Sequence, residues 1–288
     1  MGNLAYRLSS KFILSAFGLF LIGSLPALFR GISVDFVSYF NSLGEVLNKF
    51  LHPSSLVYLN DGVPWPLFPQ ILGPWLDSMR TFFLPFFCAF IIALAAAYVT
   101  LLLPPRFSKV IRFISFILES LPDILIIALL QLGVIWFYQK TGALVFNIAA
   151  YGEASEPVVL PIIVMTVLPT IMLYRLMLLD FRNEEEKPYV ELAKSLGLKR
   201  QTILLVHIFR NAVIHIFIDS KFILWMMLSN LLIVEYLFNL QGVIHFMLGD
   251  PSPLIFTVGL FLLFVPIFVF MAIGQSVIEK LTARKVEM

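Results

Sequence analysis

The chain has 288 residues, of which 60% are hydrophobic and only 13% charged, and its mean hydropathy is +0.93. A soluble domain carries about a quarter charged residues, so this composition excludes a soluble globular protein and predicts an all-α, polytopic membrane protein. Cys88 is the only cysteine, which excludes an intramolecular disulfide. The net charge of +2 decides little, but the distribution of the basic residues along the chain is informative.

Six stretches are apolar over roughly the 20 residues that a transmembrane helix needs. The first follows Arg7 and Lys11 as the apolar core of a secretory signal would, but no Ala-x-Ala-like cleavage site comes after it. We therefore expect an uncleaved first span. The six predicted spans are Phe12–Phe29, Met79–Leu103, Ile111–Tyr138, Val158–Leu179, Ala212–Leu237 and Leu254–Ile278.

Lysine and arginine residues gather on alternate sides of these spans. Segments on the side of the N-terminus hold fifteen of them and the opposite segments hold four, with Lys221 inside a span. Because cytoplasmic segments carry the excess of basic residues, both termini are predicted to be cytoplasmic. The inner set is Arg7, Lys11, Arg106, Lys109, Arg112, Arg175, Arg182, Lys187, Lys194, Lys199, Arg200, Arg210, Lys280, Arg284 and Lys285, and the outer set is Arg30, Lys49, Arg80 and Lys140.

This topology divides the chain into four predicted parts. They are an N-terminus with the first span (1–30), an extracytoplasmic segment (31–78), a five-helix transmembrane domain (79–279) that includes a cytoplasmic loop (180–211), and a cytoplasmic tail (280–288).

The extracytoplasmic segment is too long to be a simple connector. Apolar residues recur at helical spacing from Phe36 to Phe50, and Ser33 could cap this surface helix. A cluster of proline and tryptophan follows between Pro64 and Trp75. It fits either a rigid loop with tryptophans at the lipid interface or a docking surface for an external substrate-delivery protein.

The most informative polar interval is Asn183–Asn211, between two apolar spans. Tyr189–Leu196 is predicted to form a short helix that ends at Gly197, because glycine accepts the left-handed conformation that terminates helices. Three glutamates, Glu184–Glu186, precede it, where carboxylates suit the positive end of a helix dipole. Lys199 and Arg200 are expected to open a second helix that runs into the membrane. A short capped helix on a cytoplasmic loop is typical of an element that docks a partner protein.

Charged and polar residues at membrane depth are candidates for a transport pathway. Glu119 and Asp123 share one face of the third span, and Asp219, Met226 and Asn230 share a stripe of the fifth. Two alternatives compete with a pathway role. Glu119 or Asp123 could form a structural ion pair with Lys221, or Lys221 could extend toward the inner interface.

Catalytic and metal sites have little support in the sequence. The four histidines lack ligand-like spacing, and no nucleophile accompanies the membrane carboxylates, so neither a catalytic nor a metal site is predicted. The chain contains no Gly-x-x-x-x-Gly-Lys-Ser/Thr run and is not expected to hydrolyse nucleotide.

Three motifs carry a resemblance to a known family. Glu191, Ala193 and Gly197 fit the EAA loop, the coupling segment of the membrane subunits of ABC importers. The fuller patterns resemble the dipeptide, oligopeptide and nickel branch of binding-protein-dependent permeases, over roughly residues 79–275. The first is the loop run Tyr189-Val190-(x)2-Ala193-Lys194-(x)2-Gly197-Leu198, continued by His207-(x)2-Arg210-Asn211-Ala212. The second is the signature after the fifth span, Val234-Glu235-(x)2-Phe238-Asn239-(x)2-Gly242, and the third is Ser120-Leu121-Pro122 in the third span.

The resemblance implies a six-span type I importer bundle in the plasma membrane of a prokaryote. It implies a related permease chain as heterodimer partner, two cytoplasmic ATPase subunits that bind ATP and Mg, an extracytoplasmic substrate-binding protein, and no nucleic acid or bound cofactor of its own. The substrate would be short peptides, or less readily nickel or another small solute. The residues that couple to the ATPase would be Tyr189, Glu191, Ala193, Lys194 and Gly197.

The chain departs from the family pattern in places. It lacks the Pro-Gly-Asp-Pro run after the first span, Leu192 replaces the middle alanine of the loop motif, and Pro188 precedes the short helix. Two other classes therefore stay open at this point: a channel or secondary transporter, and a membrane-embedded enzyme that uses Glu119, Asp123 or a histidine.

Overall fold

The structure is a computed structural model that describes residues 2–30, 33–52, 56–60, 63–149, 157–250 and 252–282. Arg284 and Lys285, counted above on the inner side, lie outside the described residues. Six helical stretches are long and apolar enough to cross a membrane, which confirms the predicted all-α class and number of spans. They are Tyr6–Leu28, Leu72–Leu102, Asp123–Thr141, Val159–Glu185, Arg200–Leu237 and Pro253–Lys280.

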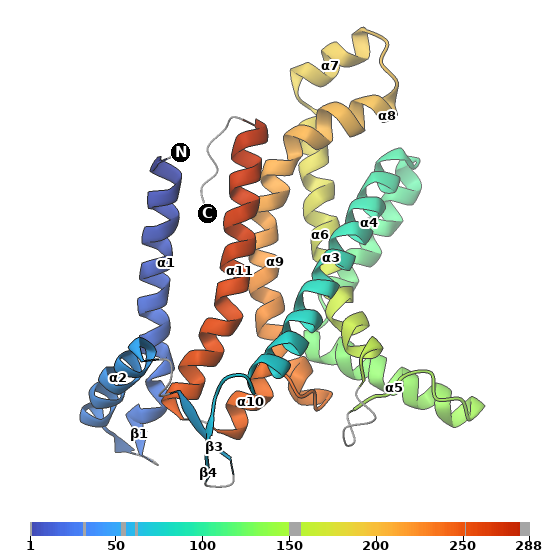
Figure 1. Cartoon of the computed structure of the whole chain (residues 1–288). Coiled ribbons are helices and arrows are strands. Elements are labelled where there is room, and N and C mark those ends of the chain that lie inside the picture. The colour runs from blue at the N-terminus through green and yellow to red at the C-terminus, as the bar shows by residue number, and fades with distance from the viewer. Residues whose placement is uncertain are drawn as a thin grey trace. The chain divides into compact units, whose positions relative to one another are not determined.

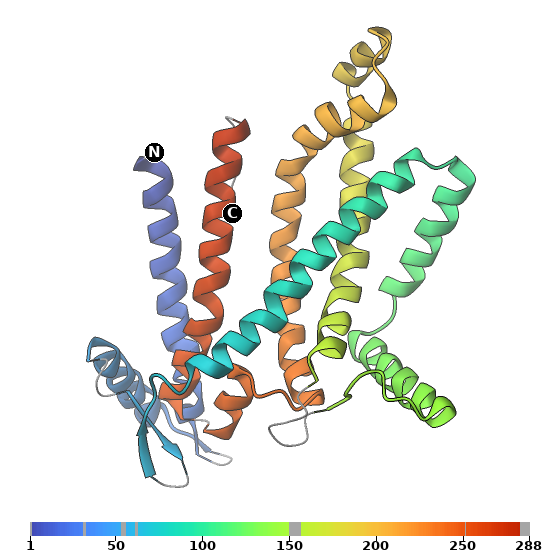
Figure 2. The same ribbon diagram turned by 45° about the vertical axis from the view of Figure 1, so that its right-hand side comes forward.

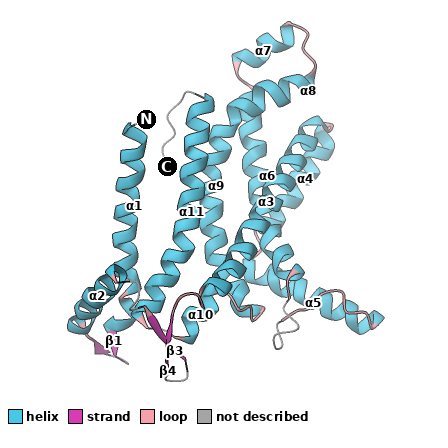
Figure 3. Cartoon of the chain, in the orientation of Figure 1, coloured by secondary structure: helices cyan, strands magenta, loops and turns pink. Residues whose placement is uncertain are grey.

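The chain forms two compact units, Met1–Arg80 with Gln241–Ile273, and Thr81–Leu240 with Gly274–Met288. The elements are coloured along the chain in Figure 1 and by type in Figure 3. In order they are α1 (Gly2–Gly23), η1 (Leu25–Leu28), β1 (Phe29–Arg30), β2 (Ser33–Val34), α2 (Phe36–Leu51), β3 (Val57–Asn60), β4 (Val63–Pro66), α3 (Leu72–Leu102), α4 (Pro105–Glu119), α5 (Asp123–Thr141), α6 (Val159–Glu185), α7 (Pro188–Ser195), α8 (Arg200–Thr202), η3 (Ile203–Ile208, a π-helical segment), α9 (Phe209–Leu237), α10 (Val243–Gly249) and α11 (Pro253–Thr282).

In the first unit, the predicted surface helix is present as α2, but its cap differs from the prediction. Asp35, not Ser33, is the N-cap residue, and its carboxylate accepts from the Ser38 backbone N–H at 2.9 Å. Ser33 instead lies in β2, which pairs antiparallel with β1. Asp35 directly precedes the first helical turn and can therefore reach the free N–H groups there, which Ser33 cannot.

The proline and tryptophan cluster of the first unit is ordered structure. Pro64, Trp65 and Pro66 belong to β4, which forms an antiparallel hairpin with β3. Trp75 lies in α3, and its indole Nε1–H donates to the Leu262 carbonyl of α11 at 2.8 Å. The second membrane helix thus begins at Leu72, seven residues before the predicted start, and Trp75 ties it to α11.

The second unit is built around α6 and α9, the most extensively packed pair of helices in the described structure. The inner faces of α6 and α9 are apolar, with Leu173, Met177, Ile223 and Met227 each at most 1% exposed. Tyr174 of α6 also donates to Thr100 of α3 at 3.2 Å. The short helix α7 lies beyond the ends of α6 and α9, away from the body of the unit (Figure 1).

The predicted third span, Ile111–Tyr138, is wrong as a single helix. The chain breaks at Ser120-Leu121-Pro122 into α4 and α5, and α5 leaves the direction of α4 at a wide angle (Figures 1 and 2). Pro122 has no N–H to continue the helical ladder and disfavours the helical conformation at Leu121. The same proline starts α5, as its N-cap residue, so the motif marks a corner between two helices.

Candidate functional site

The segment between α6 and α9 contains the predicted short helix, displaced by one residue, as α7 (Pro188–Ser195). Pro188 occupies its first turn, where a missing N–H costs nothing, so this departure from the family pattern is compatible with a helix. Gly197 has φ +73°, as predicted. The Gly197 N–H bonds to the Lys194 carbonyl at 3.0 Å and the Leu198 N–H to the Ala193 carbonyl at 3.3 Å, which is a Schellman termination.

The two sides of α7 differ in burial. Val190 and Ala193 are 0% and 5% exposed and face η3, against which α7 packs. Glu191, Leu192 and Lys194 are exposed. Among the predicted coupling residues, Ala193 therefore holds the helix in place, whereas Glu191 and Lys194 are free to contact a partner.

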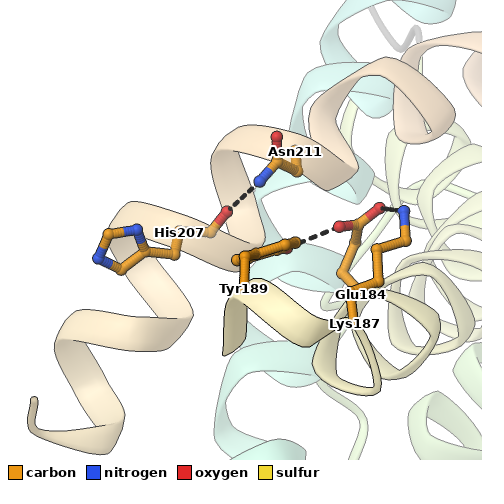
Figure 4. A network of polar contacts seen from close by, with 5 residues as sticks. All are labelled: Glu184, Lys187, Tyr189, His207 and Asn211. Atoms are coloured by element: carbon orange, nitrogen blue, oxygen red, sulfur yellow. Dashed lines mark hydrogen bonds and ion pairs between the residues drawn. The ribbon is translucent and has the colours of Figure 1, made fainter. Parts of the chain in front are cut away.

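A buried carboxylate fastens α7 to the end of α6 (Figure 4). Glu184, only 3% exposed, accepts a hydrogen bond from the Tyr189 hydroxyl at 2.6 Å and forms an ion pair with Lys187. Burial and the hydrogen bond to Glu184 raise the pKa of Tyr189 to about 12. Because a buried carboxylate without partners would be costly, these two contacts fix the path of the chain from α6 into α7.

Asn211 extends this network to α9. Its side chain lies beside the Tyr189 hydroxyl, and its Nδ2 donates to the His207 carbonyl at 3.0 Å (Figure 4). The ends of α6, α7 and α9 are thus joined through side chains, which favours their movement as one body. In the pattern His207-(x)2-Arg210-Asn211-Ala212, the Asn211 side chain therefore positions the start of α9 against Tyr189 of α7.

Arg200 makes a second set of contacts at the start of the helical run that leads into α9. Its guanidinium donates to the Leu101 carbonyl at the end of α3 at 2.6 Å, and lies 3.5 Å from the Glu185 carboxylate of α6. A force on α7 can therefore reach α3 as well as α6 and α9.

Sequence reasoning missed the role of Glu184 and Glu185. They were expected to suit the start of a helix, but they lie in the last turn of α6, where the helix dipole disfavours negative charge. Their ion pairs with Lys187 and Arg200 offset this cost. The available signal was the unusual acidic run itself, together with Tyr189 and two basic residues close by in the sequence.

The candidate pathway residues lie elsewhere in the second unit. Asn230, 9% exposed on α9, donates to the Asp123 carboxylate at the start of α5 at 2.6 Å. Asp219 lies within hydrogen-bonding range of Asp180 on α6. Glu119 forms an ion pair with Arg175 of α6. The alternative in which Glu119 or Asp123 pairs with Lys221 is therefore wrong, since other side chains occupy both carboxylates.

Met226 completes the stripe of Asp219 and Asn230 on α9 and is half-buried. The structure brings Asp123 and Asn230 together but gives Glu119 a different partner, so the five residues do not form one cluster. Within the described residues, no group of three or more histidine, cysteine, aspartate or glutamate side chains could hold a metal ion.

The residues of the Val234–Gly242 pattern lie at the C-terminal end of α9. Asn239 has φ +52°, and the Leu240 N–H reaches back to the Glu235 carbonyl at 2.9 Å. Asparagine is one of the few residues that adopt this conformation readily, so it terminates α9 as Gly197 terminates α7. Val234, Glu235 and Phe238 are each at most 1% exposed and anchor this end of the helix.

These features define a polytopic membrane protein with a helical element fastened to the ends of its spanning helices. Residues 88–282 match the family described as the inner membrane component of binding-protein-dependent transport systems, and the chain belongs to that family. It is a permease subunit of an ABC importer, in which partner ATPase subunits hydrolyse ATP and a substrate-binding partner delivers the solute. Family membership decides against the channel and enzyme alternatives.

A structural comparison agrees with this assignment. The fold is similar to that of a chain from the inward-facing MetNI methionine ABC transporter, with a TM-score of 0.57 and 14% sequence identity. The similarity covers 74% of this chain and 96% of the other. A comparison with curated protein sequences finds no match.

Proposed function

We propose that this chain forms half of the translocation pathway of an importer for short peptides, with a related permease chain as the other half. In this proposal α7 is the cytoplasmic coupling helix, both termini are cytoplasmic, and the protein spans the plasma membrane of a prokaryote. The positive-inside distribution of lysine and arginine supports the orientation. The three sequence motifs of the peptide and nickel branch support the substrate class.

The arrangement of α7 carries the coupling proposal. A helix of eight residues is too short to be stable by itself, yet here a Schellman turn ends it and the Glu184 network fixes its start. Glu191, Leu192 and Lys194 remain exposed on its outer side, and Leu192 is 61% exposed. An exposed apolar residue between two opposite charges suits a groove on an ATPase subunit.

The mechanism follows from these attachments. When the ATPase subunits close on ATP, they would displace α7, and the contacts of Tyr189, Glu184 and Arg200 would transmit that displacement to α3, α6 and α9. The bundle would then change between outward and inward access as a rigid-body movement. The Asp123–Asn230 contact, at the corner between α4 and α5, is proposed to lie along the pathway, with Asp219, Met226 and Glu119 as further candidates.

The test is substrate-stimulated ATP hydrolysis by the complete importer in proteoliposomes, with its binding protein supplied. Di-, tri- and tetrapeptides are compared with single amino acids, methionine included, and with nickel. We expect stimulation by peptides only. Stimulation by a single amino acid alone would assign the chain to an amino-acid importer, the activity that the structurally similar methionine transporter represents.

A further inference from the structure

A groove between α4 and α6 carries an excess of positive charge that the proposed coupling role of α7 does not explain. It has a volume of about 480 Å³ and lies within the second unit. Three arginines and one glutamate line it, among apolar side chains that include Phe116, Leu179 and Phe222. Buried or membrane-embedded arginines are costly unless they have a partner, so this excess requires an explanation.

The charges fall into two levels along the antiparallel helices. Arg112 of α4 lies with Arg182 of α6 at the level nearer to α7, and Glu119 lies with Arg175 at the other level. The two levels are seven residues apart on each helix, or roughly 10 Å. Arg175 has a carboxylate partner in Glu119 and also lies over the Phe116 ring, 6.0 Å from its centroid. The deeper level is therefore internally neutralised.

The level nearer to α7 is not neutralised in the same way. Arg112 Nε donates to the Ser108 carbonyl at 3.2 Å, and Arg182 Nη2 donates to the Ser108 hydroxyl at 3.0 Å. Both of these acceptors are neutral. Glu185 lies one turn beyond Arg182 and 3.5 Å from Arg200. Its single negative charge therefore acts on Arg200 as well as on Arg182. The guanidinium groups of Arg112 and Arg182 thus both donate to Ser108, and this level of the groove carries an excess of positive charge.

We propose that this groove binds an anionic phospholipid of the inner leaflet. The headgroup phosphate would lie at Arg112 and Arg182, whose planar guanidinium groups present paired donors to phosphate oxygens. One acyl chain would run along Phe116, Leu179 and Phe222 toward the middle of the membrane. The groove carries its excess positive charge at the end nearer to α7, its deeper ion pair is neutral, and the remaining lining is apolar, which matches a phospholipid better than a free anion. This inference requires the orientation proposed above but does not depend on the transported substrate.

The test measures lipid retained by the purified full-length chain in native mass spectrometry. The chain is titrated with phosphatidylglycerol or phosphatidylcholine of identical acyl chains, and separately with inorganic phosphate. We expect preferential binding of phosphatidylglycerol. The affinity should fall about five-fold in Arg112→Gln and about 25-fold in the double variant with Arg182→Gln, since each basic residue near an anionic lipid contributes roughly that factor. Among the described residues, the hydrogen bond that Arg112→Gln removes goes to the backbone of its own helix, so folding should be preserved.

Arg106→Gln is the matched control, because Arg106 lies exposed on the same helix and outside the groove. Its affinity should equal that of the original chain. Three results would overturn the proposal. An equal loss of affinity in the Arg106 variant would indicate an effect of bulk charge. Binding of inorganic phosphate as tight as that of the lipid would indicate a site for a free anion. Absence of the lipid from the importer complex isolated through a tag on this chain would indicate that protein covers the groove.

Discussion

The Tyr189 hydroxyl donates a hydrogen bond of 2.6 Å to the buried carboxylate of Glu184 and so joins the first turn of α7 to the last turn of α6. A partner that pushes on α7 therefore acts directly on a membrane-spanning helix. The sequence separation is only five residues, yet the contact crosses the boundary between two helices.

Replacement of Tyr189 by phenylalanine should loosen this joint. The variant removes the donor and leaves the Glu184 carboxylate with Lys187 as a partner, at a cost of about 1–3 kcal/mol. Glu184→Gln combined with Tyr189→Phe should cost less than the sum of the single changes, as a double-mutant cycle in urea can show. Additive costs would mean that the two residues do not interact.

The pH dependence of the same contact has a defined sign. In the folded chain the Tyr189 pKa is about 12, whereas the ordinary value is about 10. The folded state therefore holds this proton more tightly than the unfolded state, so the stabilisation is complete below pH 10 and is lost as the pH rises toward 12. Titration of tyrosinate absorbance should show a late-ionising component that disappears in Tyr189→Phe. An unchanged titration would contradict this assignment.

Gly197→Val should uncouple the permease from its ATPase. At φ +73° a β-branched residue is strained by about 1 kcal/mol or more, and relief of that strain would redirect α7. We expect normal membrane insertion but loss of ATPase co-purification and of stimulated hydrolysis. Gly142→Val is the control, because Gly142 has φ +70° at the end of α5, far from α7 along the chain. Retained docking in Gly197→Val would refute the coupling role.

Glu191→Lys tests the outer side of α7 without strain. Glu191 is exposed, so the substitution should change stability by no more than about 0.5 kcal/mol. ATPase co-purification should nevertheless fall, with loss of transport in vesicles. Glu186→Lys reverses an exposed charge just before α7 and should leave docking intact. Equal behaviour of the two variants would show that net charge, not position, matters.

Asn230→Ala should impair uptake while the complex still assembles, because Asp123 then loses its donor in the proposed pathway. Uptake per unit of protein in the membrane is the measurement, with Ser229→Ala as control, since Ser229 is exposed on the adjacent side of α9. A defect that is fully explained by loss of protein would make the Asp123–Asn230 contact structural.

The orientation can be tested with reporter fusions. A reporter after Arg200 should be cytoplasmic and one near Asn60 should be external, as the distribution of basic residues predicts. Both reporters on the same side would contradict the six-span topology.

The sequence by itself determined the membrane class, the number of spans, the short helix and its termination at Gly197. These depend on local properties: the length of an apolar run and the conformational freedom of glycine. The corner at Pro122 was also locally encoded, but a continuous apolar run on both sides hid it. Hydropathy does not register a missing N–H.

Only the tertiary structure decided the partners of the charged residues. Glu119 and Asp123 are four residues apart and would share a face of one straight helix, yet the corner between α4 and α5 gives them different partners, Arg175 and Asn230. These pairs join residues 56 and 107 positions apart. Which side chain a carboxylate meets depends on how helices pack against one another, and periodicity within a single helix cannot specify that.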